Sequence, residues 1–191
     1  PNRKQIRARR MRKKERVFTP EEFKRIYETA STPEEALIVL FMYTMGTRID
    51  ETLKLDWSRV LLDTDPPLYR WTVDTNKAEK VGEHALHPSL IEPLKELRVR
   101  RLQEKTFLLF PQKLDNSKPL REQQIDWKAW RARANLDWHW TPHTFRHTCL
   151  TNLFNDPRNP QAVICKLYRT SLQVALETYV KVTRESMLAM R

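Results

Sequence analysis

The stretch from Thr32 to Trp57, TPEEALIVLFMYTMGTRIDETLKLDW, decides the fold of this chain. It opens with a helix-capping Thr-Pro-Glu-Glu sequence, and Gly46 is typical of a helix end. The residues between them are apolar on nearly every side, so we expect this helix to lie at the centre of the core. Arg48 follows at once, and a short helix is predicted from about Arg48 to Leu55. Arg48 would therefore be pinned beside the core by the packing of its neighbours.

The flanking segments predict more helices and one small sheet. Thr19-Pro20-Glu21-Glu22 repeats the capping signature and begins an amphipathic helix over 20–30. Residues 57–87 alternate β-branched and aromatic residues with polar ones, which predicts two or three antiparallel strands. The fold class is therefore mostly α with a small antiparallel β-sheet (α+β). The remaining predicted elements are a charged helix from Pro88, a short apolar strand or extended piece at 107–110, and helices at about 121–134, 143–155, 160–167, 172–180 and 184–190.

Length and composition limit the classes of protein to consider. A chain of 191 residues can bury one good core, and its hydrophobic share of 40% suits a globular protein. No apolar run approaches the roughly 20 residues of a membrane-spanning helix. Cys149 and Cys165 both lie in apolar helical patterns, so we expect reduced thiols in a cytoplasmic protein. With only two glycines, a glycine-rich phosphate loop is excluded.

The positive charge is concentrated at the amino end. Residues 1–16 contain nine Arg or Lys and one Glu, a net +8 out of the chain's +11, so the other 175 residues carry only +3. We interpret this arm as a linker or a segment that tracks along DNA; the alternative is a solubilising tail. Its candidate DNA-binding residues are Arg7, Arg9, Arg10, Arg12, Lys13 and Lys14.

The stretch TPHTFRHT, Thr141 to Thr148, places three potential cations at a predicted helix start. The free N–H groups of a helix start favour an anion there, whereas burying uncompensated cations is costly. His143 and Arg146 are three residues apart, so they share one face and can address one phosphate. The alternative for His143 is a structural histidine. His147 and Cys149 fall on other faces, and we expect them to be packing residues.

Arg48 and Tyr179 could complete such a site. The guanidinium of Arg48 could contact a phosphate through two nitrogens; the alternative is an ion pair with Asp50, Glu51 or Glu22. Tyr179 follows Leu172, Ala175 and Leu176, which we expect to point inward. A tyrosine there is most often a core residue with a solvated hydroxyl. Beside two guanidiniums, however, its ionised form would be favoured, and a phenolate is a usable nucleophile.

Four motifs together resemble the catalytic domain of the tyrosine recombinases, the phage-integrase family. They are TPEEFKRIYETA (19–30), YTMGTRIDETLKLDW (43–57), HTFRHT (143–148) and ALETYVKV (175–182), in that family's order. The resemblance extends from about Arg16 to Val182. It implies the recombinase catalytic-domain fold. It also implies a site-specific recombinase or integrase that cleaves and rejoins double-stranded DNA through a 3′-phosphotyrosyl intermediate, without a metal or other cofactor.

The resemblance also implies roles for individual residues. Arg48 and Arg146 would clamp the scissile phosphate, and His143 would assist in proton transfer and phosphate binding. Tyr179 would be the nucleophile. The family uses a lysine on a β-hairpin as the general acid; Lys77 fits best, with Lys80 as competitor, although a lysine in a hairpin turn is usually only solvated.

One motif departs from the family's pattern. Many recombinases have Leu-Gly-His about nine residues before the tyrosine, and that histidine hydrogen-bonds the phosphate. This chain reads KLYRTSLQ at 166–173, so either Arg169 or Thr170 could donate instead. Arg169 would donate more strongly because it is charged. The departure leaves the arginine pair and the tyrosine in place.

The resemblance suggests an organisation as well. Residues 1–17 would be the basic arm or linker that follows an absent core-binding domain, and residues 18–191 the catalytic domain, so we expect a fragment of a longer protein. The family assembles as tetramers on DNA, whereas this chain alone should be a monomer. We expect a bacterial cytoplasmic protein encoded by a phage or another mobile element.

Two alternatives share most of these residues. A type IB topoisomerase uses the same chemistry to relax supercoils as a monomer. A non-catalytic DNA-binding relative would use the arginines only to hold phosphates. A basic RNA-binding domain is disfavoured because the sequence lacks the aromatic-studded sheet that such domains use.

Overall fold

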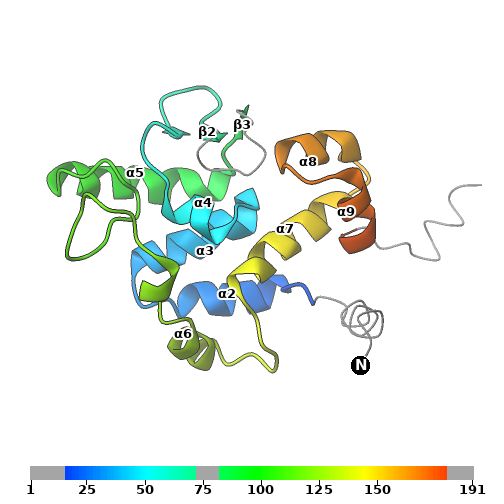
Figure 1. Ribbon diagram of the computed structural model, residues 1–191, viewed down its shortest axis with the longest axis horizontal. Helices are drawn as coiled ribbons and strands as arrows, with labels where there is room; N and C mark the ends of the chain where they lie inside the picture. The colour runs from blue at the N-terminus through cyan, green and yellow to red at the C-terminus, as the bar shows by residue number, and fades with distance from the viewer. Residues whose placement is uncertain (1–15, 72–81, 180–191) are drawn as a thin grey trace, which may run out of the picture.

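The computed structural model describes residues 16–71 and 82–179. Figure 1 shows helices gathered around two central ones, α3 (Pro33–Met45) and α7 (Pro142–Asn155), with a small sheet against one side. This confirms the mostly α class with a small antiparallel sheet. The helices are α2 (Pro20–Glu28), α3 (Pro33–Met45), α4 (Ile49–Leu53), α5 (Pro88–Gln103), the 3₁₀ turn η2 (Glu122–Gln124), α6 (Trp127–Ala134), α7 (Pro142–Asn155), α8 (Gln161–Leu167) and α9 (Leu172–Thr178), and the strands are β1 (Val60–Leu61), β2 (Leu68–Trp71) and β3 (Gly82–Ala85).

Helix α3 lies at the centre of the core, as its sequence predicts. The Thr32 hydroxyl accepts a hydrogen bond from the Glu35 N–H at 3.1 Å, which caps the helix start. The helix ends at Gly46, whose φ of 58° is the left-handed conformation that favours glycine. Its apolar residues are buried on all sides, and α3 packs along α7. The chain then passes directly from the core into α4, which begins next to Arg48.

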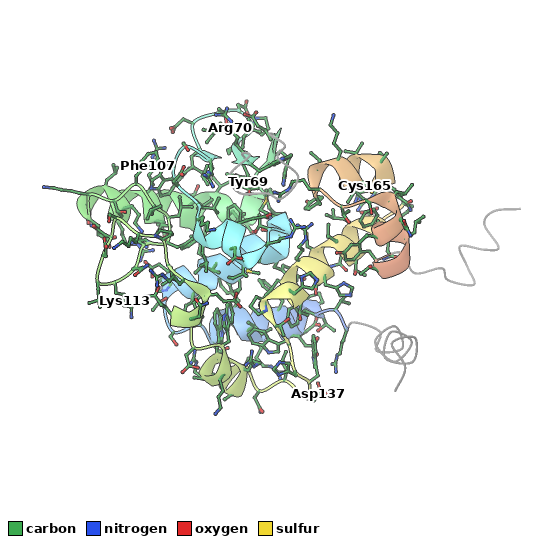
Figure 2. All side chains as sticks on the ribbon, viewed as in Figure 1. Tyr69, Arg70, Phe107, Lys113, Asp137 and Cys165 are labelled. Atoms are coloured by element: carbon green, nitrogen blue, oxygen red, sulfur yellow. The ribbon has the colours of Figure 1, made fainter. Side chains whose placement is uncertain are left out.

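The sheet has the order β1-β2-β3, with both pairs antiparallel. In its register Tyr69 pairs with His84 and Trp71 with Gly82. Side chains alternate across β2, as they must in a strand. Figure 2 shows Arg70 on the outer side of the sheet and Tyr69 toward the helices, where its ring meets Phe41 edge-on at 5.4 Å. One face of the sheet therefore closes over the central core.

A second, smaller hydrophobic cluster forms where α8 and α9 pack on the carboxyl half of α7. Figure 1 shows these three helices together at one end of the molecule. The buried members of this cluster are Cys149, Leu150, Phe154, Ile164, Tyr168, Ala175 and Tyr179. The cluster places the end of α9 next to the middle of α7.

Between the strand and the extended piece predicted at 107–110, the structure has the extended piece: Leu108 makes an isolated bridge with Asp56, and Leu109 and Phe110 anchor the segment by burial. The helix predicted over 121–134 is broken into η2 and α6, because the Asp126 side chain caps α6 by accepting from the Ala129 N–H at 2.9 Å. The helix predicted at 184–190 lies outside the described residues.

The inward orientation predicted for Leu172 and Leu176 is wrong. These side chains are 52% and 50% exposed, whereas Ala175 is fully buried. Helix α9 is a short helix that contacts the body through Ala175 and Tyr179, four residues apart and hence on one face. Leu172 and Leu176 lie off that face and remain at the surface.

The basic arm falls almost wholly outside the described residues. Arg16, where the described chain begins, is ion-paired with Glu22 at 2.6 Å and lies over the Trp138 ring at 4.9 Å. The division into an arm at 1–17 and a catalytic domain at 18–191 remains a prediction. Within the two described ranges, the helices are too short or too polar to cross a membrane.

Candidate active site

Arg48 is the residue that caps the start of α4. Its backbone N–H donates to Oε2 of Glu51 at 3.0 Å, and its Nη1 donates to Oε1 of the same carboxylate at 2.9 Å. Glu51 is buried, but the Arg48 side chain is 49% exposed. The predicted alternative of an ion pair with Glu51 is therefore present, and it fixes the guanidinium while leaving it open to solvent.

Arg146 lies one turn into α7 and is 3% exposed. Its Nη1 donates to the Gly46 carbonyl, and its Nη2 donates to the Tyr168 carbonyl at 2.6 Å. Burial lowers the pKa of this guanidinium, and the neighbouring charge of Arg48 lowers it further. An arginine remains charged under these conditions. Two arginines thus share one region of strong positive potential, which favours an anion.

The two histidines of the HTFRHT motif lie in different environments. His143 is exposed on the first turn of α7, one turn before Arg146. His147 is buried, and its ring lies 5.4 Å from the ring of Tyr179. Cys149 is also buried, and burial raises the pKa of its thiol to about 12. The prediction that His147 and Cys149 are packing residues is confirmed.

Tyr179 is the residue that ends α9. Its N–H donates to the Ala175 carbonyl at 2.9 Å, and its carbonyl accepts from Asn155 Nδ2 at 2.8 Å. Its ring stacks on Phe154 at 5.7 Å, and the side chain is buried. The charge of an ionised Tyr179 would raise the pKa of Arg146, so the two groups lie within electrostatic reach of each other.

The turn between α8 and α9 carries Arg169 and Thr170. Arg169 has φ 53°, a left-handed conformation that is uncommon for a residue with a side chain. Its side chain is 5% exposed, and its Nη2 donates to Oε2 of Glu51 at 2.7 Å. Its Nε and Nη1 are buried without a hydrogen-bond partner among the described residues. Thr170 is placed by its backbone N–H, which donates to the Cys165 carbonyl at 3.1 Å.

The Glu51 carboxylate binds both Arg48 and Arg169. Burial raises the pKa of its carboxyl, but the Arg48 N–H and the charges of Arg169 and Arg48 outweigh burial, so the pKa lies below its ordinary value. The carboxylate therefore stays ionised, with one oxygen facing Arg48 and the other facing Arg169. The sequence suggested Glu51 as a partner of Arg48, but nothing in it indicated the contact with Arg169, 118 residues away.

Lys77 and Lys80 lie outside the described residues, as do the six basic residues of the arm. The strands that flank the hairpin are described: β2 ends at Trp71 and β3 begins at Gly82. The guanidinium of Arg169 lies over the Trp71 ring at 5.7 Å. The base of the hairpin thus borders the arginine cluster, and the role of Lys77 stays a prediction.

A known protein family matches most of the chain. The family model described as the phage integrase family matches residues 16–185. No curated protein sequence matches the chain at a significant level.

Solved structures share the fold. The crystal structure of XerA recombinase matches with a TM-score of 0.73 at 19% identity, covering 92% of this chain and 63% of that one. The Tn1549 transposon integrase in complex with circular intermediate DNA matches at 0.70 and 17%, covering 92% and 64%. The catalytic domain of bacteriophage HP1 integrase matches at 0.60 and 15%, covering 92% and 94%. The chain thus spans less than two thirds of the first two proteins.

These likenesses, at under 25% identity, establish the fold alone, whereas the family model covers nearly the whole chain. The positions that carried the resemblance in the sequence are also the ones that the fold gathers in space: Arg48 follows α3, Arg146 is anchored to the end of α3, and Tyr179 packs against α7. The chain belongs to the phage integrase family, the tyrosine recombinases.

Proposed function

We propose that this chain is the catalytic domain of a site-specific recombinase that cleaves and rejoins double-stranded DNA. One observation carries the proposal: Arg48 and Arg169 bind the same carboxylate, Glu51, Arg146 binds the carbonyl of the residue before Arg169, and an ionised Tyr179 would interact with Arg146. A cluster of fixed cations beside a phenol suits the attack of a tyrosine on a phosphodiester.

The arginines act on the phosphate. As the phosphorus becomes five-coordinate, negative charge increases on its non-bridging oxygens, and Arg48 and Arg146 donate hydrogen bonds to them. Both guanidiniums are oriented before DNA binds, so little reorganisation is needed at the moment of reaction. Loss of one such donor typically lowers the rate by about 10²–10³-fold.

Tyr179 supplies the nucleophile. Its phenolic oxygen forms a bond to phosphorus while the bond from phosphorus to the 5′-oxygen breaks, which gives a 3′-phosphotyrosyl link. Lys77 donates a proton to the leaving 5′-oxygen, and His143 assists in proton transfer. Since the link conserves the phosphoester bond, the reverse reaction rejoins a strand without a cofactor. The phenol is buried in the smaller cluster, so α9 must shift before attack.

Arg169 takes the place where many family members have histidine. Its Nε and Nη1, buried and without hydrogen-bond partners among residues 16–71 and 82–179, are donors that a phosphate oxygen can satisfy. Thr170 remains the alternative donor. Since a charged donor makes the stronger hydrogen bond, we assign the role to Arg169.

The substrate is double-stranded DNA, and the active assembly is a tetramer. The Tn1549 integrase of the same fold is described in complex with DNA, which supports this choice of substrate. Arg7, Arg9, Arg10, Arg12, Lys13 and Lys14 would contact the DNA backbone, which makes affinity strongly salt-dependent.

A nicked suicide substrate tests the proposal. Wild-type protein should form a covalent protein–DNA adduct that survives a denaturing gel, and Tyr179→Phe should form none while its DNA affinity stays within about twofold of wild type. An adduct in the variant would show that another residue is the nucleophile, with Tyr168 as the next candidate. DNA binding without any wild-type adduct would indicate a non-catalytic relative. Relaxation of plasmid lacking a specific site would indicate a topoisomerase.

A further inference from the structure

We infer that Trp71 is a positioning residue for Arg169, and that Gly82 leaves the space in which the Trp71 ring lies. The inference rests on the proposed role of Arg169 as a phosphate donor. It extends that role to the sheet: the strands at the base of the hairpin hold a guanidinium that belongs to the turn between α8 and α9.

The contact between Trp71 and Arg169 joins two parts of the chain that are far apart in sequence. The centre of the Arg169 guanidinium lies 5.7 Å from the centroid of the Trp71 ring, within the range of a cation–π interaction. Both side chains are buried, so solvent weakens the attraction little. The guanidinium thus lies over the Trp71 ring, while Glu51 binds its Nη2. Its Nε and Nη1 are left without a hydrogen bond among the described residues.

Gly82 provides the space for the Trp71 ring. It faces Trp71 across the β2–β3 pair, and a Cβ built on it would lie 2.6 Å from Cε2 of the indole, which is impossible without movement. Any residue other than glycine would push the ring away from its place. The chain has only two glycines, and the other, Gly46, has its carbonyl on Arg146. Each glycine therefore helps to place one arginine of the cluster: Gly46 accepts a hydrogen bond from Arg146, and Gly82 leaves room for the ring next to Arg169.

Aromatic contacts fix the sheet against the turn that carries Arg169. The His84 ring lies 5.7 Å from the Trp71 ring and 5.5 Å from the ring of Tyr168, the residue before Arg169. The His84 ring therefore fixes the position of the Trp71 indole relative to Tyr168. Arginine has a long side chain with many rotamers, so a guanidinium that must reach a phosphate needs the restraint of the Trp71 ring as well as that of Glu51.

Four variants test the inference: Trp71→Leu, Trp71→Phe, Gly82→Ala and Trp138→Leu. Leucine removes the π face, phenylalanine keeps one, and alanine at 82 displaces the indole without removing it. Trp138→Leu is the control, because Arg16 lies over Trp138 in the same kind of contact at 4.9 Å. Figure 2 shows the neighbouring Asp137 at the end of the molecule opposite Tyr69 and the sheet.

The first measurement is the rate of adduct formation at saturating DNA. Trp71→Leu and Gly82→Ala should each lower it by about tenfold or more with DNA affinity within about twofold of wild type. Trp71→Phe should recover most of the rate, and Trp138→Leu should match wild type. Adding Trp71→Leu to Arg169→Ala should slow the reaction no further, because both act through one guanidinium.

The second measurement does not depend on activity. In the folded protein without DNA, the Arg169 Nε–H should give a protected signal in a nitrogen-15 NMR spectrum, assigned by its loss in Arg169→Lys. The signal should persist in Trp71→Phe and Trp138→Leu, and disappear or broaden in Trp71→Leu and Gly82→Ala.

The outcomes separate this inference from the proposed function. A slow Arg169→Ala with a normal Trp71→Leu overturns the inference and leaves the recombinase proposal standing. The inference is also overturned if Trp71→Leu slows the Arg169→Ala variant further. An unchanged Arg169 signal in Trp71→Leu and Gly82→Ala overturns it as well. A wild-type chain that makes no adduct contradicts the proposed function, and the NMR signal then still decides whether Trp71 positions Arg169.

Discussion

Arg146 is held by two backbone carbonyls, whereas Arg48 and Arg169 share the carboxylate of Glu51. The difference matters because a carbonyl orients a guanidinium without neutralising it. Two guanidiniums thus share a single carboxylate, and the third is held by neutral groups. The cluster keeps an excess of positive charge that a phosphate can neutralise.

At the scale of single residues, Arg169 and Thr170 can be separated by experiment. We expect Arg169→Ala to slow adduct formation by about 10²–10³-fold, the usual cost of one donor to the transition state. Thr170→Ala should have an effect of less than about threefold, since a neutral hydroxyl donates a weaker hydrogen bond than the guanidinium that Glu51 holds in place. Single-turnover rates on the suicide substrate measure both. A slower Thr170→Ala would assign the donor to the hydroxyl, and two normal rates would mean that neither residue replaces the histidine.

At the scale of elements, the junction between α3 and α4 connects the core to the site. The left-handed Gly46 lets the chain turn directly from the buried helix into the Arg48 position. Its carbonyl accepts from Arg146, and Tyr168 and Cys149 pack where a Cβ would lie. Gly46 thereby connects the end of α3 to α7 and to the turn after α8.

Gly46→Ala should therefore affect both stability and activity. The alanine would adopt φ 58° at a cost of about 1–2 kcal/mol, and its Cβ would lie 2.9 Å from the Tyr168 ring and 3.2 Å from the Cys149 sulfur. We expect the free energy of unfolding in urea to fall by at least about 1 kcal/mol, and adduct formation to fall by about tenfold or more as Arg146 shifts. Thr44→Ala, two residues earlier in α3, is the control and should leave the rate unchanged. Full stability in Gly46→Ala would show that the turn can relax.

At the scale of the whole molecule, the site lies between two hydrophobic clusters. Arg48 lies between Met45 and Ile49, which pack in or on the central cluster, and Tyr179 belongs to the smaller cluster of α7, α8 and α9. Arg146 binds a carbonyl from each side, Gly46 and Tyr168. A small shift of α9 can therefore move the tyrosine while both clamp arginines keep their anchors.

Helix α9 also exposes Leu172 and Leu176, which are four residues apart on one face and each about half exposed. An exposed apolar face of this kind suits contact with another copy of the chain on DNA. We expect Leu172→Ser combined with Leu176→Ser to leave stability within about 0.5 kcal/mol and single-site cleavage unchanged. Recombination between two sites should fall by about tenfold or more as assembly weakens.

A native gel with paired DNA sites, run beside a recombination assay, measures this effect. Val99→Ser combined with Leu102→Ser is the matched control, since these residues of α5 are similarly exposed at another face. Equal recombination by the α9 variant and wild type would show that this face is not an assembly contact.

Most elements could be predicted because their signals are local. The capping sequences at Thr19 and Thr32 and the glycine at 46 set helix bounds through contacts within a few residues. The predictions stayed open or failed where packing at a distance decides. For the apolar run at 107–110 the sequence left a strand and an extended piece open, and only its neighbours in space choose between them. Likewise, Leu172 is exposed because α9 contacts the body through a face centred on Ala175.

The sequence by itself determined the fold class, the family resemblance and the candidates for the reactive residues, because capping, periodicity and motif spacing are properties of neighbouring positions. It also identified Arg169 as a candidate donor, through its distance from Tyr179. The tertiary structure alone decided that Arg169 reaches Glu51 and lies over the Trp71 ring, and that Arg146 rests on the carbonyls of Gly46 and Tyr168. These contacts join residues up to 118 positions apart, and no local pattern encodes which distant groups satisfy a buried charge.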